Sequence, residues 1–170
     1  MRKGSAAVGS ILFFLCAPCV VAGLIPFLLT DRYRMPVSTQ PAFVIVAALL
    51  VAAGLALLVH AFVRFVVEGL GTPAPVAPTA RLVVGGAYRH VRNPMYLAVL
   101  SIILGQALLF GSFSVAVYAV VVAAAVVSFV HYYEEPVLAK RHGAEYETYR
   151  RAVPGWLPRL TPWRQPTERT

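Results

Sequence analysis

Acidic residues are scarce in this chain of 170 residues. Seven Asp and Glu stand against fifteen Lys and Arg, and charged residues make up only 13% of the sequence, whereas 59% is hydrophobic. A soluble domain of this length could not bury so much apolar surface, which excludes an ordinary soluble globular protein. No Gly-x-Gly-x-x-Gly follows a strand pattern, so a Rossmann nucleotide-binding domain is excluded as well.

Cysteine and histidine are also rare. The two cysteines, Cys16 and Cys19, have the spacing of a redox pair, but they lie in an apolar stretch without a thioredoxin-like βαβ pattern. We interpret them as small packing residues. The four histidines have no spacing typical of a metal site, so no metal is expected.

The sequence contains instead a set of long apolar runs. Its mean hydropathy is +0.72, and several runs reach the length that crosses a membrane. The net charge of +8 could indicate nucleic acid, but the basic residues flank the apolar runs, so no nucleic-acid partner is expected. Because they gather before the first run, between the second and third, and after the fourth, we predict a multi-pass cell (inner) membrane protein with both termini cytoplasmic.

The fold class that follows is an all-α, polytopic membrane protein, one domain over residues 1–170. We expect about four transmembrane helices, the last two forming a C-terminal helical hairpin, plus an interfacial helix. The first helix should be bent, because Pro18 and Pro26 free carbonyls that need neighbouring partners. The predicted spans are residues 7–29, 41–67, 94–110 and 113–133.

The predicted hairpin turns at Gly111-Ser112, so its two ends, Arg92-Asn93-Pro94 and Glu134-Glu135, should meet at one membrane depth. Asn93 is a favourable N-cap and Pro94 a favourable first helical residue, so the helix should begin here with its amide donors facing the loop. Such an end stabilises a carboxylate or phosphate, and Arg92 adds a charge capable of bidentate binding. These features predict an anion-binding site.

Glu134 and Glu135 have no local explanation, because acidic residues oppose the dipole at a helix C-terminus and disfavour membrane insertion. They need a cationic partner, which could be a ligand or one of Arg89, Arg92 and His131. A structural ion pair with Arg92 is the alternative interpretation.

Tyr88 and Tyr96 lie beside the same helix end. Aromatic faces there suit a ligand that carries both a cation and a carboxylate, although an interfacial aromatic belt is the alternative. In the loop of residues 69–92, Leu82-Val83-Val84 and Tyr88 flank Gly85-Gly86. This pattern allows the backbone to lie against a ligand, unless the loop is a plain connector.

A polar stripe of His60, Arg64 and Glu68 lies on one face of the second predicted span. His60 and Arg64 are candidate substrate contacts at an entrance, and a structural stripe that reaches toward headgroups is the alternative.

Beyond Pro136 the pattern predicts a short interfacial helix, broken at Gly143 and ending at Pro154. Trp156 and Trp163 would extend the interfacial anchoring.

Several motifs follow one another in the second half of the chain: Leu-Val-x-x-Gly-x-Tyr-x-x-x-Arg-x-Pro-x-Tyr, a hairpin, Glu-Glu-x-x-Leu, Gly-x-x-Tyr-x-x-Tyr and Val-Pro-x-x-x-Pro. This order resembles that of the isoprenylcysteine carboxyl methyltransferases and related phospholipid methyltransferases. The resemblance covers about Arg81 to Pro158. It implies an integral membrane methyltransferase that uses S-adenosylmethionine. The acceptor would be a lipophilic small molecule or a prenylated group, with either an isoprenylcysteine-like carboxylate or a lipid headgroup as the methylated part. Membrane lipids would be its partners. Residues 1–68 would form the acceptor side, 69–158 the cofactor-binding part and 159–170 a tail.

Carried over by position, the resemblance also implies a set of cofactor contacts. On physical grounds, Arg92 and the helix end would hold the methionine carboxylate, and Glu134 the ammonium or the ribose hydroxyls. Tyr88 or Tyr96 would lie near the sulfonium, and Glu135 would deprotonate an amine acceptor. The implied contacts are Arg81, Leu82, Val83, Tyr88, Asn93, Pro94, Met95, Tyr96 and Glu134.

The chain departs from the family at Asn93, where the family has histidine. Asparagine keeps the capping function but cannot titrate near neutrality, so an acid/base role of that histidine would be lost. A non-enzymatic membrane protein that retains the methyltransferase-like fold is therefore the alternative to an enzyme.

Overall fold

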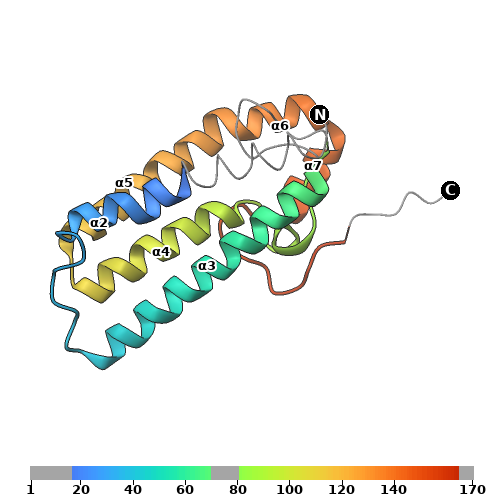
Figure 1. Ribbon diagram of the computed structural model, residues 1–170. Coiled ribbons are helices and arrows are strands. Elements are labelled where there is room, and N and C mark those ends of the chain that lie inside the picture. The colour runs from blue at the N-terminus through green and yellow to red at the C-terminus, as the bar shows by residue number, and fades with distance from the viewer. Residues whose placement is uncertain (1–16, 70–80, 165–170) are drawn as a thin grey trace.

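The computed structural model describes residues 17–69 and 81–164, and within them it contains helices and irregular segments but no strand (Figure 1). The predicted all-α class is therefore confirmed for the described part of the chain, whereas residues 7–16 of the first predicted span lie outside it. In chain order the elements are the π turn η1 (Val20–Leu24), α2 (Ile25–Leu29), α3 (Pro41–Gly69), the 3₁₀ turn η2 (Gly86–Arg89), α4 (Pro94–Phe110), α5 (Phe113–Phe129), the π turn η3 (Val130–Glu134), α6 (Glu135–His142) and α7 (Ala144–Ala152).

Two helical stretches are long and apolar enough to cross a membrane, Pro41–Arg64 and Phe113–His142, with mean hydropathies of 3.0 and 2.5. Only 17% of the apolar window of 18 residues within each stretch is buried inside the protein, so most of this window faces outward, as lipid contact requires. Val20–Leu29 and Pro94–Phe110 are shorter apolar helices. These features support a membrane protein, and the number of four crossings stays a prediction.

Helices α3 and α4 lie side by side (Figure 1) and make the most extensive helix contact of the described residues. Glycines allow their backbones to touch. A Cβ atom on Gly54 would lie 2.9 Å from the carbonyl oxygen of Ala98, and one on Gly105 would lie 2.9 Å from that of Ala47. Small residues at such crossings are typical of helix pairs in membranes.

The turn between α4 and α5 confirms the predicted hairpin. Gly111 adopts a left-handed conformation with φ of 56°, which a residue with a Cβ atom rarely adopts, and closes α4 as its C-cap. The hydroxyl of Ser112 then accepts a hydrogen bond from the backbone N–H of Val115 and caps α5.

The helix of the fourth predicted span does not end at Glu134-Glu135, so the predicted helix end is wrong, whereas the point at which the chain leaves the membrane stays a prediction. The helix continues through Pro136 to His142, and the two acidic residues lie within it. A proline ring clashes with the carbonyl one turn earlier. The π turn η3 widens the helix at this point, because Glu135 donates its N–H to the carbonyl of Val130, five residues back.

A second π turn, η1, precedes Pro26 in the same way. Ile25 donates its N–H to the carbonyl of Val20. The carbonyl of Val21 thereby loses its usual α-helical donor, and the carbonyl of Ala22 loses its own because Pro26 has no N–H.

Side chains from the hairpin supply both missing donors. The Tyr118 hydroxyl donates to the carbonyl of Val21 at 2.9 Å, and Nε2 of Gln106 donates to the carbonyl of Ala22 at 2.7 Å. This confirms that the first predicted span is irregular at its proline and that its freed carbonyls have neighbouring partners. The hairpin is thereby fixed to η1 by polar contacts in an apolar setting.

Replacing Gln106 with leucine is expected to lower the free energy of unfolding by about 1–3 kcal/mol, because the buried Ala22 carbonyl loses its donor. The Tyr33 hydroxyl, which donates to Oε1 of Gln106 at 2.8 Å, loses its acceptor as well. Thermal unfolding followed by circular dichroism in detergent measures the change. Ser101→Ala is the matched control, since among the described residues the Ser101 hydroxyl bonds only within its own helix, to Leu97. Equal stability of both variants would contradict this role of Gln106.

Candidate functional site

The two ends of the hairpin meet, as the sequence predicts. The Tyr96 hydroxyl at the start of α4 donates a hydrogen bond of 2.9 Å to Oε2 of Glu134 in η3. Arg92, just before α4, forms an ion pair of 2.8 Å with Glu135 at the start of α6. The loop, the α4 N-terminus and the α5–α6 junction therefore form one site.

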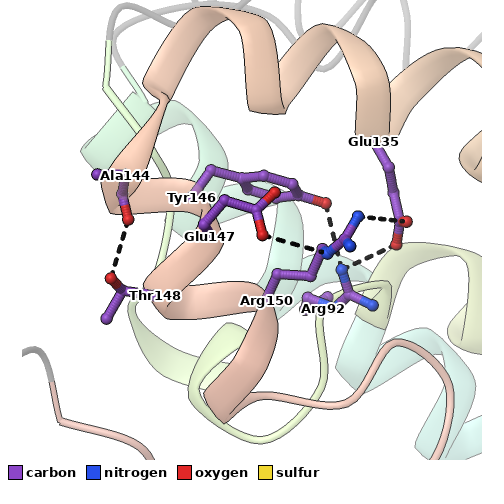
Figure 2. A network of polar contacts seen from close by, with 7 residues as sticks. All are labelled: Arg92, Glu135, Ala144, Tyr146, Glu147, Thr148 and Arg150. Carbon is purple, nitrogen blue, oxygen red and sulfur yellow. Dashed lines mark hydrogen bonds and ion pairs between the residues drawn. The ribbon is translucent and has the colours of Figure 1, made fainter.

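Glu135 belongs to a network that ties this junction to α7 (Figure 2). Its carboxylate accepts the 2.8 Å contact from Arg92 and lies 3.8 Å from Arg150, and Nη1 of Arg92 donates to the Tyr146 hydroxyl at 3.2 Å. Burial raises the pKa of Tyr146 to about 12, with Glu135 as a smaller cause, so its phenol is neutral. For Glu135, the structure thus contains the ion pair that was the alternative interpretation.

Glu134 has a different environment. Its described polar contact is the hydrogen bond from Tyr96, and within residues 17–69 and 81–164 no basic side chain forms an ion pair with it. An acidic side chain without a cation in a largely apolar site is unfavourable. A cationic ligand would stabilise it.

Asn93 occupies the N-cap position of α4, but its side chain makes no capping hydrogen bond, so the predicted cap is wrong in that respect. The side chain is directed toward Gly155 instead, where an added Cβ atom would lie 3.5 Å from Nδ2 of Asn93. Asn93 is only 7% exposed. Its Nδ2 and the neighbouring Nε of Arg92 are buried donors without a partner among the described residues. Buried donors of this kind cost free energy unless an acceptor binds them.

A C-terminal segment, residues 154–163, fastens the loop that carries these donors, and we call it the strap. The backbone N–H groups of Arg92 and Asn93 donate to the carbonyls of Pro154 and Gly155. Further along, Arg159 donates its N–H to the carbonyl of His90.

The strap ends on a reciprocal pair of hydrogen bonds. Trp163 donates its N–H to the carbonyl of Arg89, and Nε of Arg89 donates to the carbonyl of Trp163 at 2.6 Å. The Trp163 ring lies 5.4 Å from that of Tyr149, and the Trp156 ring lies 6.4 Å from that of Tyr96. The tryptophans therefore contact the site, and their predicted membrane anchoring stays a prediction.

Helix α7 buries its tyrosines against the loop. Tyr146, Tyr149 and Val153 form a core cluster that Leu82 and Val84 join. The helix is separated from α6 at Gly143, as predicted, and its buried face contacts protein.

Tyr149 fixes the loop at a second point, because its hydroxyl donates to the carbonyl of Tyr88 at 2.7 Å. Burial raises the pKa of both Tyr88 and Tyr149, so both phenols stay neutral.

The polar stripe on α3 holds the other side of the loop. Glu68 accepts the backbone N–H of Gly85 at 2.9 Å and forms an ion pair of 3.0 Å with Arg64. Gly86 has φ of 56°, and a Cβ atom on it would lie 2.5 Å from Nε2 of His60. Within the described residues, His60 and Arg64 therefore contact the loop and line neither cavity described next. Their role as substrate contacts stays a prediction.

Two cavities flank the polar residues of the site. The larger has a volume of about 260 Å³ and lies between η1, α3, α4 and α5, and the smaller, of about 70 Å³, lies between the loop, α6 and α7. Four residues line both: Tyr88, Arg92, Asn93 and Glu134. We call these four the shared wall.

The predicted cofactor contacts divide between the cavities. Leu82 and Val83 line the smaller cavity, whereas Pro94, Met95 and Tyr96 line the larger. Arg81 is exposed and lines neither.

Several lining residues were not identified from the sequence. Tyr146 and Tyr149 line the smaller cavity, and their Gly-x-x-Tyr-x-x-Tyr motif could have indicated it. Leu58, Phe62 and Val126 line the larger cavity, and they carry no such signal because every neighbouring position is apolar too.

A comparison with protein families matches residues 42–145, more than half of the chain, to the family described as phospholipid methyltransferase. The match begins in α3 and ends in α7, so it covers the loop, the hairpin and both glutamates of the site. Comparisons with curated proteins and with solved structures give no match.

Proposed function

The chain belongs to the phospholipid methyltransferase family, and from this membership we propose that it transfers a methyl group from S-adenosylmethionine to a lipophilic acceptor. The family and the outward-facing apolar helices indicate a membrane methyltransferase. We further propose that the protein crosses the cell (inner) membrane several times, with both termini in the cytoplasm, as the distribution of basic residues predicts.

One observation supports the choice of cofactor most directly: the shared wall contains polar and charged groups that have no partner among the described residues. Among the described residues, the buried donors Nε of Arg92 and Nδ2 of Asn93 have no acceptor, and the carboxylate of Glu134 has no cation. A ligand that carries both a carboxylate and positive charge satisfies all three groups. S-adenosylmethionine carries a carboxylate, an ammonium and a sulfonium.

The residues of the site therefore fit the cofactor. Arg92 and Asn93, at the N-terminus of α4, would hold its carboxylate, with the helix dipole as further support. Glu134 would hold a positive group. Leu82, and Val83 beside it, would contact the apolar part of the ligand from the smaller cavity.

When bound, the cofactor supplies an activated methyl group on sulfur, which a nucleophile displaces directly. Positioning and electrostatics carry most of such catalysis, so no covalent intermediate with the protein is required. Arg92 is held in place by Glu135 and Tyr146, and the loop by the strap. A carboxylate acceptor needs no base. For an amine acceptor, Glu135 would have to take the proton although it is already paired with Arg92.

The experiment that tests this function is calorimetric binding of S-adenosylmethionine to the detergent-purified, full-length protein. We expect binding that weakens about 10- to 100-fold in Asn93→Asp, because a hydrogen bond to a charged group contributes about 1.5–3 kcal/mol and aspartate replaces the donor by a negative charge. Asn93→His, which keeps an N–H donor and restores the family's residue, is the control and should bind within a few-fold of the natural protein. If the folded natural protein does not bind S-adenosylmethionine, the non-enzymatic alternative is favoured.

A further inference from the structure

The larger cavity has a polar end and an apolar interior. Its polar end is the shared wall, where the methyl transfer of the proposed function would take place. Beyond the wall its lining is apolar and comes from four helical elements. These side chains are Val21 of η1, Leu58 and Phe62 of α3, Val99 of α4, and Val122 and Val126 of α5.

The cavity extends along the helices. Val122 and Glu134 both line it, and at ~1.5 Å per residue they lie about 18 Å apart along α5 and η3. This is more than half of the ~30 Å hydrocarbon core of a bilayer. The cavity is therefore elongated and points from the shared wall into the membrane region of the protein.

Its far end is closed by the contacts that fix η1 to the hairpin. One turn beyond Val122 lies Tyr118, whose hydroxyl is bound to the carbonyl of Val21 at 2.9 Å. Ile102, which follows Val99 on α4, is buried in the core cluster that contains Leu58. Neither Tyr118 nor Ile102 lines the cavity, so the apolar space ends at this level.

The volume limits what the cavity can take. An apolar cavity of roughly 150 Å³ binds one benzene ring, so a cavity of about 260 Å³ has room for about ten carbon atoms. The two chains of a membrane phospholipid contain several times that number. An elongated space of this size accommodates the proximal part of one chain.

We propose that the larger cavity selects acceptors by their hydrocarbon part. It binds a single aliphatic chain, with the reactive group at the shared wall, and it accommodates about ten carbons of that chain. The inference rests on the proposed function for the identity of the reacting end. The selection itself is a property of the cavity and is measurable by binding alone.

The test uses full-length protein in nanodiscs with a dansyl-labelled undecanoic acid as fluorescent probe, displaced by unbranched alcohols of six to eighteen carbons. Apparent affinities are corrected for partition into nanodiscs without protein. We expect affinity to increase up to about ten carbons and then to stop increasing. A phosphatidylethanolamine with two sixteen-carbon chains should compete at least tenfold less well than its single-chain lyso form.

Variants of α5 locate the effect in the cavity. Val122→Phe fills the far end, so affinity should stop increasing at a chain about three carbons shorter. Val120→Phe, at a position that is 68% exposed on the same helix, should leave this limiting length unchanged. Val122→Leu, with a smaller shift, serves if the phenylalanine variant does not fold.

Three outcomes would each overturn the proposal: affinity that rises steadily to eighteen carbons, equal competition by the two-chain lipid, or a limiting chain length that Val122→Phe leaves unchanged. Because displacement requires no methyl transfer, these outcomes are independent of S-adenosylmethionine binding, which tests the proposed function separately.

Discussion

Replacing Glu134 by glutamine is expected to weaken binding of S-adenosylmethionine by about 30-fold or more while the protein stays folded. Glutamine has the same shape and can still accept the hydrogen bond from Tyr96, so only the negative charge is lost. Removing one member of a buried charge pair between protein and ligand costs about 2–5 kcal/mol. Calorimetry on the purified variant measures the change.

The stability of this variant without ligand distinguishes a binding role from a structural one. Because Glu134 has no ion pair among the described residues, neutralising it removes an uncompensated charge, and the unfolding temperature should stay the same or rise. Glu147→Gln, at a partly exposed residue of α7, is the control for a general loss of negative charge and should bind normally. Unchanged binding by Glu134→Gln would contradict the role proposed for this carboxylate.

The second large effect is expected at Arg92. Arg92→Gln leaves Glu135 without its 2.8 Å partner in a site where the two side chains are only 16% and 18% exposed. Breaking a buried ion pair from one side costs about 3–5 kcal/mol, and here the lower end applies because Arg150 remains 3.8 Å from Glu135. Thermal or denaturant unfolding in detergent measures this loss.

The double variant Arg92→Gln/Glu135→Gln separates the two roles of Arg92. It removes both charges, so most of the lost stability should return, because replacing a whole buried pair by neutral groups is often nearly neutral. Binding of S-adenosylmethionine should stay weak, since the guanidinium that would hold the carboxylate is still absent. A double variant that binds like the natural protein would show that Arg92 acts only as the partner of Glu135.

Much of the site was predictable because its signals are local. Pro94 starts α4 and Gly111 ends it, because proline is favoured at the first position of a helix and glycine at the left-handed position that closes one. Their spacing, together with the length of the next apolar run, brings Tyr96 and Glu134 together. The need of the first span for outside hydrogen-bond partners also followed from its prolines, Pro18 and Pro26.

Other features depend on contacts between distant segments. Asn93 has good capping propensity, but backbone hydrogen bonds to the strap and the direction of its side chain toward Gly155 override it. Pro136 was interpreted as a helix start, because nothing in the sequence shows that η3 widens the preceding turn enough to continue the helix. In α3 and α4 nearly every position is apolar, so no periodicity distinguishes Gly54, which touches a neighbouring backbone, from residues that face outward.

The strap also has a consequence for the order in which the protein matures. The segment of residues 89–93 leaves the ribosome before the hairpin, but its hydrogen-bond partners between Pro154 and Trp163 are about 60 to 75 residues further along the chain. At roughly 5–20 residues per second, this is a delay of several seconds. During it, the membrane helices can already insert while the loop lacks the contacts that fix it. A chain interrupted before Pro154 would therefore insert but could not complete the site, so ligand binding distinguishes finished molecules from unfinished ones.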